Sequence, residues 1–280
     1  MKADLHVHTV NSDGKKKLNE ILKSTNVSYN YPHVLAITDH HYLTLKSVYK
    51  KGLCTVIPGM EISAIHSGVS CHLTVYSSHP KLTRKCEKML SNIIKGYQMR
   101  SKRIYKKIVQ EGYKLPPYNS IRKSLPGPVY TYDLAHVLGK IIKINNDRGV
   151  IEWSKKHCNL LFVPEKNFLP DANLVISEFQ KSGFVVCYAH PGTRFNSKKQ
   201  LNDFEKIIAK LKNINLDGLE VFSSHHNIKQ TNFFMKLAKK YNLLITGGSD
   251  FHGVGRGSDN TILNLNSRYT NLFLRRISIK

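Results

Sequence analysis

Short apolar runs alternate with longer stretches of helical periodicity along most of the chain. The runs are rich in Val, Ile, Leu and Ala, which is typical of buried parallel strands. We expect an opening strand that carries His6 and His8, followed by strands over 34–38, 54–57, 72–76, 184–189, 218–222 and 243–246. Helices are expected between them over 15–28, 43–51, 174–183, 200–211 and 230–241. This alternation predicts an α/β fold with a mainly parallel sheet closed into a barrel.

The middle of the chain has a different pattern. A long basic helical stretch covers 85–111, prolines then break the chain into turns, and further helices are expected over 131–142 and 148–157. We interpret this part as a mostly helical insertion, or cap. The predicted division is therefore a barrel domain over 1–81 and 172–280 and an insertion over 82–171.

Composition and charge narrow the class of protein. Hydrophobic residues make up 41% of the chain, and no apolar run approaches the length that spans a bilayer. With Lys+Arg 43 against Asp+Glu 19, the net charge of +24 favours polyanionic partners such as nucleic acids or phosphorylated metabolites. A Lys- and Asn-rich chain encoded by an AT-rich genome would also be basic without any nucleic-acid role, so genome composition stays open as an alternative explanation of the charge. The 5 cysteines form no C-x-x-C pair, which favours a reducing, cytoplasmic location.

Histidines and acidic residues follow the predicted strands at the positions where the strands end. These residues are His40, Glu61, His190, His225, His226, Asp250 and His252. The imidazoles of His6 and His8 share one face of the first strand, because side chains alternate with period two. The carboxyl ends of parallel strands meet on one face of a barrel, so we expect these side chains to lie together. Imidazole nitrogens and carboxylates are ligands that divalent metals prefer.

Five segments carry a resemblance to a known family. They are Asp4-Leu-His-Val-His-Thr with Ser12-Asp-Gly, Ile37-Thr-Asp-His-His, Pro58-Gly-Met-Glu-Ile, Ala189-His-Pro-Gly and Gly248-Ser-Asp-Phe-His-Gly. In this order they resemble the signature motifs of the PHP (polymerase and histidinol phosphatase) superfamily. The resemblance covers most of the chain outside the insertion. It implies a distorted (β/α)7 barrel that holds up to three divalent metals, manganese being expected first and iron or zinc as alternatives.

The resemblance also implies which residues would bind the metals. A first metal would take His6, His8, Glu61 and Asp250; a second would take Glu61, His72 and His190; and a third would take Asp13, His40 and His252. Glu61 would then bridge the first two metals. Asp4 and Asp39 are expected to orient ligands, and His41 is expected to be a solvated neighbour of His40.

Such a site would hydrolyse phosphate esters. A hydroxide held between two metals stays deprotonated at neutral pH and can attack phosphorus in line, and the same cations offset the charge of the phosphoryl oxygens. The leaving alcohol would take its proton from a metal-bound water or from His225 or His226. Arg194 is expected to clamp a substrate phosphate, with Arg256 as a second candidate.

The organisation most resembles the branch of nucleoside 3′,5′-bisphosphate phosphatases and 5′-to-3′ oligoribonucleases. That branch commonly carries Gly-Arg-Pro-His in the insertion, whereas this chain has Gly127-Pro-Val-Tyr-Thr-Tyr, so Tyr130 and Tyr132 could stack on a base instead. The expected substrate is therefore a nucleotide or short RNA, with no membrane and no obligatory protein partner. Two alternatives stay open. One is a small-metabolite phosphatase for histidinol phosphate or a cyclic sugar phosphate, and the other is a non-catalytic nucleic-acid-binding scaffold.

Overall fold

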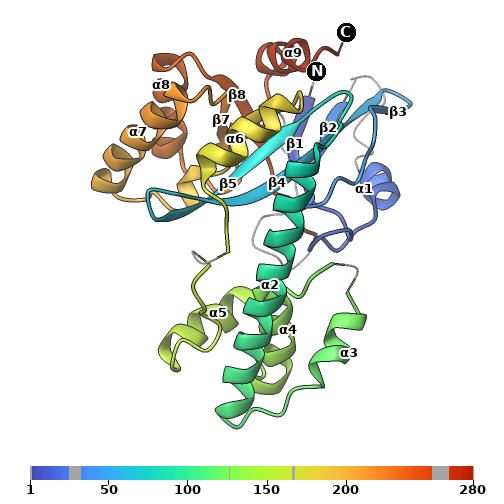
Figure 1. The fold of residues 1–280 in the computed structure, drawn as a ribbon, viewed down its shortest axis with the longest axis vertical. Coiled ribbons are helices and arrows are strands. Elements are labelled where there is room, and N and C mark those ends of the chain that lie inside the picture. Colours follow the sequence, from blue (N-terminus) through green and yellow to red (C-terminus); the bar gives the residue numbers. More distant parts are fainter. Residues whose placement is uncertain (1, 25–32, 126, 166–167, 254–264, 280) are drawn as a thin grey trace.

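The computed structural model describes residues 2–24, 33–125, 127–165, 168–253 and 265–279 (Figure 1). Its strands are β1 (Lys2–Val7), β2 (His33–Ile37), β3 (Tyr49–Lys51), β4 (Cys54–His66), β5 (Val69–Tyr76), β6 (Val185–Tyr188), β7 (Gly218–Ser223) and β8 (Leu244–Gly248). Its helices are α1 (Leu18–Ser24), α2 (Arg84–Gln110), α3 (Tyr118–Lys123), α4 (Thr131–Ile142), α5 (Asp147–Lys156), α6 (Ala172–Lys181), α7 (Lys198–Asn213), α8 (Ile228–Lys240) and α9 (Ser267–Arg276), with a 3-10 turn η1 (Pro191–Thr193).

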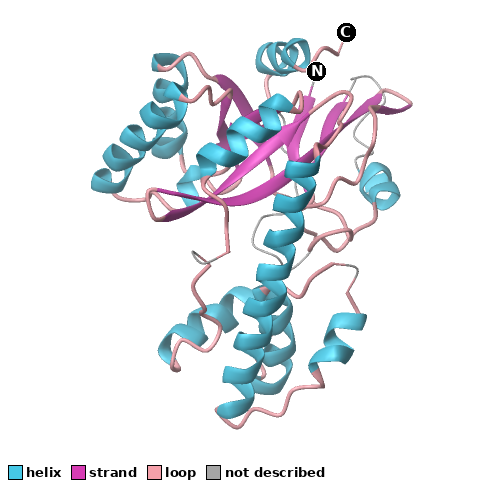
Figure 2. Ribbon diagram, viewed as in Figure 1, coloured by secondary structure: helices cyan, strands magenta, loops and turns pink. Residues whose placement is uncertain are grey.

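The strands form one sheet in the order β1-β2-β4-β5-β6-β7-β8, with β3 paired to β4 off this path. All pairs along the path are parallel except β4–β5 and β5–β6, because β5 runs against its neighbours. The two ends of the path meet at a parallel bridge between Val7 and Phe251, where the amide of His8 donates to the carbonyl of Phe251 at 2.9 Å. Helices α6, α8 and α9 pack on the outside of the sheet (Figure 2). The predicted α/β barrel is therefore confirmed as a nearly closed, distorted barrel.

Two expectations for the first third of the chain are wrong. No helix forms over 43–51; the hydroxyl of Thr44 instead donates to the carboxylate of Asp39, and β3 pairs with β4. The strand expected to end at 57 continues to His66, because a tight turn at Ser67 and Gly68 folds it back against β5. Both turn residues have positive φ, 49° and 78°, as a two-residue hairpin requires.

Helices α2 to α5 extend away from the barrel (Figure 1). The first half of α2 packs on the barrel through Met89, Ile93 and Tyr97, whereas Ile104 and Ile108 in its second half belong to a separate apolar cluster with α3, α4 and α5. One continuous helix thus joins two cores. Among the described helices, none is both long and apolar enough to cross a membrane. Where the insertion begins and ends stays a prediction.

Candidate metal centre

The mouth of the barrel gathers the histidines and carboxylates of the five motifs. His6 lies near the end of β1, His190 follows β6 and Asp250 follows β8, so the parallel strands deliver them to one end. His72 lies in β5 directly before Leu73, where the pairing of this strand with β6 begins. Because β5 runs antiparallel to its neighbours, its start lies at the same end of the barrel as the ends of the others. Reversal of this one strand is what brings His72 into the site.

Glu61 is the hub of the site. Its side chain is 1% exposed, and imidazole nitrogens surround both of its oxygens. Oε1 lies 2.8 Å from Nδ1 of His72 and Nε2 of His190, and Oε2 lies 3.2–3.3 Å from Nδ1 of His40 and from Nε2 of His6 and His8. Burial by itself would raise the pKa of Glu61, but these histidines outweigh burial and lower the pKa well below its ordinary value. Glu61 is therefore an anion with each oxygen directed at a different group of imidazoles.

Two groups of side chains have potential ligand atoms that all lie within 4.8 Å of one another. One group is His6, Glu61, His190 and Asp250, and the other is His8, Asp13, His40 and His252. His8 stands between them, since its Nε2 also lies 3.3 Å from Glu61 and 3.2 Å from Oδ1 of Asp250. The contacts also fit the sets that the resemblance implied. Nε2 of His6 and of His8 each lie 3.2–3.4 Å from Oε2 of Glu61 and Oδ1 of Asp250, whereas His72 and His190 share Oε1 of Glu61. Which set binds which metal stays a prediction.

The donor atoms fit divalent cations. Nε2 of His6, Nε2 of His8 and Oε2 of Glu61 are buried and have no hydrogen-bond partner among the described residues. The two imidazole nitrogens each lie 3.3 Å from this carboxylate oxygen. A cation at the centre of each group would satisfy them, and a mixed set of imidazoles and carboxylates suits manganese, iron or zinc.

Two of the candidate ligands have a backbone conformation that is uncommon for residues other than glycine. His190 has φ of 24° and Asp250 has φ of 54°, both in the left-handed region. Such conformations cost roughly 1–3 kcal/mol for residues other than glycine, and they persist where the surrounding structure enforces them, most often at functional sites. The strain at these two residues is what a site built to hold its ligands in fixed positions would show.

The histidines of the site differ in their charge. Burial by itself would lower the pKa of His8, but its contacts with Asp250 and Glu61 outweigh burial and raise the pKa to about 10. The pKa of His6 is raised for the same reason, against the effect of burial, by Glu61 and Glu220. For His40 burial dominates and lowers the pKa to about 4. Without a cation, His6 and His8 are therefore positively charged imidazolium groups at neutral pH, whereas His40 is a neutral imidazole.

Metal binding is accordingly expected to release protons. An imidazole must be neutral to bind a cation, so the metal has to displace the protons of His6 and His8. Apparent affinity should therefore rise with pH up to about 10, by about tenfold per pH unit for each displaced proton. Titration calorimetry of Mn²⁺ into chelator-treated protein, in buffers of different ionisation enthalpy, measures this release. A binding enthalpy that is the same in every buffer would contradict it.

Glu220 is a functional residue that the sequence analysis missed. It lies in the middle of β7, it is 1% exposed, and its Oε2 is 2.8 Å from Nδ1 of His6. The carboxylate holds a proton on Nδ1, so that Nε2 of His6 faces the metal group. His252 is held in a similar way, since its Nδ1 donates to the carbonyl of Asp250 at 2.8 Å while its Nε2 faces Asp13. The signal for Glu220 was a single acidic residue in an otherwise apolar strand.

Replacing Glu220 with glutamine is expected to weaken metal binding by about 10- to 100-fold, because an amide no longer fixes the tautomer and basicity of His6. Metal content after dialysis and the Kd from calorimetry measure the effect. Glu205→Gln is the matched control, because Glu205 is partly exposed and pairs with Lys240 instead. Equal metal affinity in both variants would remove this role from Glu220.

Three residues next to the candidate ligands support the backbone. Asp4 accepts from the amides of Ser249 at 2.9 Å and His6 at 3.2 Å, and Asp39 accepts from the amide and hydroxyl of Thr9 at 2.7 Å each.

The expectation that His41 is a solvated neighbour of His40 is wrong. Its side chain is buried rather than solvated, and its Nε2 accepts from the amide of Ser63 at 3.1 Å.

A pocket of about 320 Å³ opens over the two groups of ligands. The insertion supplies much of its wall through Tyr97, Arg100, Tyr130, Thr131, Tyr132 and Glu165. The sequence analysis named the two tyrosines at 130 and 132 but missed Arg100 and Glu165. These two form an ion pair at 3.4 Å, and Nε of Arg100 donates to the carbonyl of Val163. Two parts of the chain that are far apart in sequence thus enclose one site.

The structure separates the proposed substrate-contacting residues. Arg194 lines the pocket and donates to Oγ of Ser70 at 3.3 Å, and His225 lines it with Nε2 2.9 Å from Oδ2 of Asp250. His226 is not among the lining residues. Its Nδ1 donates to the carbonyl of Val221 and its Nε2 accepts from the amide of Gly192, so both ring nitrogens are occupied by backbone. Of the two histidines expected as alternative proton donors, the geometry therefore favours His225. Arg256 lies outside the described residues.

Comparisons with known proteins agree with this architecture. A 5′-3′ exoribonuclease from Haemophilus influenzae is 26% identical over 264 residues, which cover 90% of this chain and 90% of the relative. A structure from Bifidobacterium adolescentis, of a protein inferred to be a metal-dependent phosphoesterase, has a TM-score of 0.74 at 22% identity and covers 98% of this chain and 96% of its own. An amidohydrolase structure from Chromobacterium violaceum, with bound sulfate and no metal, has a TM-score of 0.78 at 18% identity and covers 98% and 97%.

No model of a protein family matches the sequence. The two structural likenesses establish the fold, and the exoribonuclease shows that the similarity extends along most of the sequence. Together with the motifs at the barrel mouth, these comparisons are consistent with the PHP superfamily and support a hydrolase.

Proposed function

We propose that the chain is a metal-dependent phosphoesterase that hydrolyses phosphate esters of nucleotides, either a nucleoside 3′,5′-bisphosphate or the 5′ end of short RNA. One observation carries the proposal. Two groups of imidazoles and carboxylates, joined through Glu61 and His8, lie at the floor of a pocket whose wall holds Arg194. Phosphate ester hydrolysis needs this combination of cation ligands and anion-binding groups.

The metals would be held by His6, Glu61, His190 and Asp250 and by His8, Asp13, His40 and His252, with His72 as a further ligand beside Glu61. When bound, they would activate water for attack on phosphorus and offset the charge of the phosphoryl oxygens.

The chain's own residues would position the substrate. Arg194 would bind a phosphate at the pocket wall, with its guanidinium suited to two parallel hydrogen bonds. Asp250 would orient the ring of His225 through Nε2, and His225 would give the leaving alcohol a proton from its other ring nitrogen. Glu220 would keep the proton on Nδ1 of His6.

Three features favour a nucleotide as the substrate. The pocket volume of about 320 Å³ is within the range of about 300–1,000 Å³ that encloses small ligands. Tyr132, which is 41% exposed at the pocket wall, offers a face on which a base can stack. The sequence relative named as an exoribonuclease also acts on a nucleic acid, which supports the same class.

The test compares three substrates with the manganese-loaded protein. These are adenosine 3′,5′-bisphosphate, a 5′-phosphorylated oligoribonucleotide and histidinol phosphate, with release of phosphate or mononucleotide followed over time. We expect turnover of one or both nucleotide substrates and none of histidinol phosphate. Turnover of histidinol phosphate alone would indicate a small-metabolite phosphatase. Oligonucleotide binding without release from any substrate would indicate a non-catalytic scaffold.

A further inference from the structure

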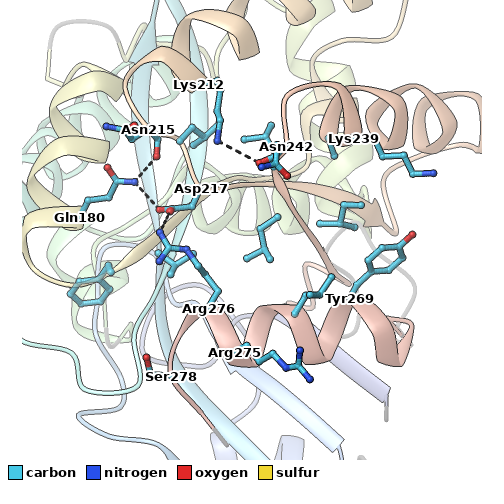
Figure 3. Close-up of a pocket in the computed structure, with 18 of the residues that line it drawn as sticks. Gln180, Lys212, Asn215, Asp217, Lys239, Asn242, Tyr269, Arg275, Arg276 and Ser278 are labelled. Carbon is cyan, nitrogen blue, oxygen red and sulfur yellow. Dashed lines mark hydrogen bonds and ion pairs between the residues drawn. The ribbon is translucent and has the colours of Figure 1, made fainter.

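A second and larger groove opens at the opposite end of the barrel (Figure 3). It lies where β6 and β8 begin and where α6, α7 and α8 end, and α9 forms one wall; we call it the α9 groove. The metal ligands follow the other ends of β6 and β8, so the length of these strands separates the two sites. Its volume is about 1320 Å³. Pockets for small ligands enclose about 300–1,000 Å³, so this groove has room for a segment of a polymer.

The α9 groove is strongly basic. Its cationic side chains are Lys212, Lys239, Arg268, Arg275 and Arg276. Asp217 is the single carboxylate among the described residues that line it. That carboxylate is already engaged within the wall, where it accepts from Nε2 of Gln180 at 2.8 Å and from Nη2 of Arg276 at 2.6 Å (Figure 3). No carboxylate among the described lining residues is left to neutralise the other four cations.

Three of these cations are accessible. Lys239, Arg268 and Arg275 are exposed, and none of them forms an ion pair with another described residue. Lys212 donates to the carbonyl of Asn242 at 3.4 Å, which leaves its charge uncompensated. Several uncompensated cations that line one groove create a positive potential in it, so the arrangement favours an anionic occupant.

The shape and the neutral groups indicate what kind of anion fits. Residues at the C-terminal ends of α6, α7 and α8 line the groove, and the partial negative charge of these ends disfavours a small anion beside them. The arginines lie on α9, at the side of the groove, where successive phosphates of a strand could contact them. Leu272 is 46% exposed and Tyr269 is partly buried on the same helix, and together they offer an apolar surface for bases. A flat lipid surface could not enter a concave groove.

We propose that the α9 groove binds single-stranded nucleic acid through its phosphate backbone. Guanidinium groups match phosphate in a bidentate manner, and a net charge of +24 on the chain adds long-range attraction for a polyanion. The groove is a second binding surface, and its function does not depend on the metal centre. An acidic peptide would satisfy the same charges, and its carboxylates pair with arginine in the same bidentate manner. The apolar surface of Tyr269 and Leu272 favours a nucleic acid, whose bases can pack on it.

The test measures binding of a fluorescein-labelled, hydrolysis-resistant 2′-O-methyl oligoribonucleotide by anisotropy at a series of KCl concentrations. The groove variant combines Lys239→Gln, Arg268→Gln and Arg275→Gln. The control variant removes the same charge from exposed positions on the insertion, Lys106→Gln, Lys114→Gln and Lys140→Gln. Loss of three phosphate contacts should reduce the slope of log K against log[KCl] by about 2 and weaken binding roughly tenfold or more, whereas the control should stay close to wild type.

Three results would overturn the proposal. They are unchanged oligonucleotide binding in the groove variant, an equal loss in the control, and displacement of the oligonucleotide by poly-glutamate as readily as by unlabelled RNA, which would favour an acidic peptide. Circular dichroism confirms that each variant folds, and Arg275→Gln alone carries the test if the triple variant does not. Hydrolysis of a mononucleotide is measured in parallel and should not change. If the wild-type protein does not hydrolyse the mononucleotide at all, the proposed phosphoesterase function is wrong, but the proposal for the α9 groove is unaffected.

Discussion

Replacing Glu61 with glutamine is expected to lower kcat by about 10³-fold or more. An amide has no negative charge and would place an NH₂ group against imidazole nitrogens that now face a carboxylate oxygen at 2.8–3.3 Å. Both groups of ligands lose an anionic oxygen at once, and with it the electrostatic stabilisation of the reacting phosphate. Steady-state kinetics with saturating Mn²⁺ and a nucleotide substrate measure the effect.

His190→Ala is expected to have a similar effect on kcat, because His190 meets the same carboxylate oxygen at 2.8 Å. His136→Ala is the control, since His136 lies in the insertion and is 53% exposed. Circular dichroism should show all three variants folded. Full activity in both Glu61→Gln and His190→Ala would mean that the site is assigned to the wrong residues.

Gly248→Ala is the second change with a large expected effect. A β-carbon at this position would lie 2.1 Å from Cβ of His6 and 2.7 Å from its backbone nitrogen. Backbone atoms cannot move aside, so β8 would have to separate from β1 and carry His6 away from the other ligands. We expect a loss of roughly 1–3 kcal/mol in the free energy of unfolding together with loss of metal binding.

Denaturant unfolding and metal content after dialysis measure the two parts of this prediction. Gly127→Ala is the control, because a β-carbon there would first meet the carbonyl oxygen of Ser12 at an ordinary contact distance of 3.4 Å. A Gly248→Ala protein that is as stable as wild type and binds metal as well would show that the close approach of β1 and β8 is not required.

Much of the site could be predicted because a parallel barrel gathers the carboxyl ends of its strands. That rule needs only the approximate end of each strand, and the apolar runs before His190 and Asp250 end where the periodicity indicates. The helix over Thr131–Ile142 was likewise predicted with its exact bounds, and at its start the carboxylate of Asp133 accepts from the amide of Tyr130 at 2.8 Å.

The positions of Glu61, β5 and His41 could not be predicted, because they depend on strand pairing and tertiary contacts that the local periodicity of the sequence does not encode. Glu61 lies inside β4 rather than after a strand, because the hairpin at Ser67 and Gly68 extends β4 and reverses β5. A Ser-Gly dipeptide between apolar stretches is a weak turn signal, so the reversal was missed. His41 was misjudged because its left-handed backbone turns the ring inward, beside Tyr97, where only the fold could place it.

The contribution of the insertion was also beyond the sequence pattern. The helical period of α2 identifies the face that packs on the barrel, but it does not say that Arg100 on the next turn reaches the pocket and pairs with Glu165. Such contacts join residues that are distant along the chain, and they depend on how α2 leaves the barrel. The same limit applies to the α9 groove, which needs the ends of α6, α7 and α8 to be placed against α9.

The most direct measurement is anomalous diffraction from crystals of the manganese-loaded protein, collected on both sides of the manganese absorption edge. The account predicts strong anomalous peaks within ligand distance of His6, Glu61, His190 and Asp250, and of His8, Asp13, His40 and His252. A fully metallated preparation with no peak in either group would contradict it.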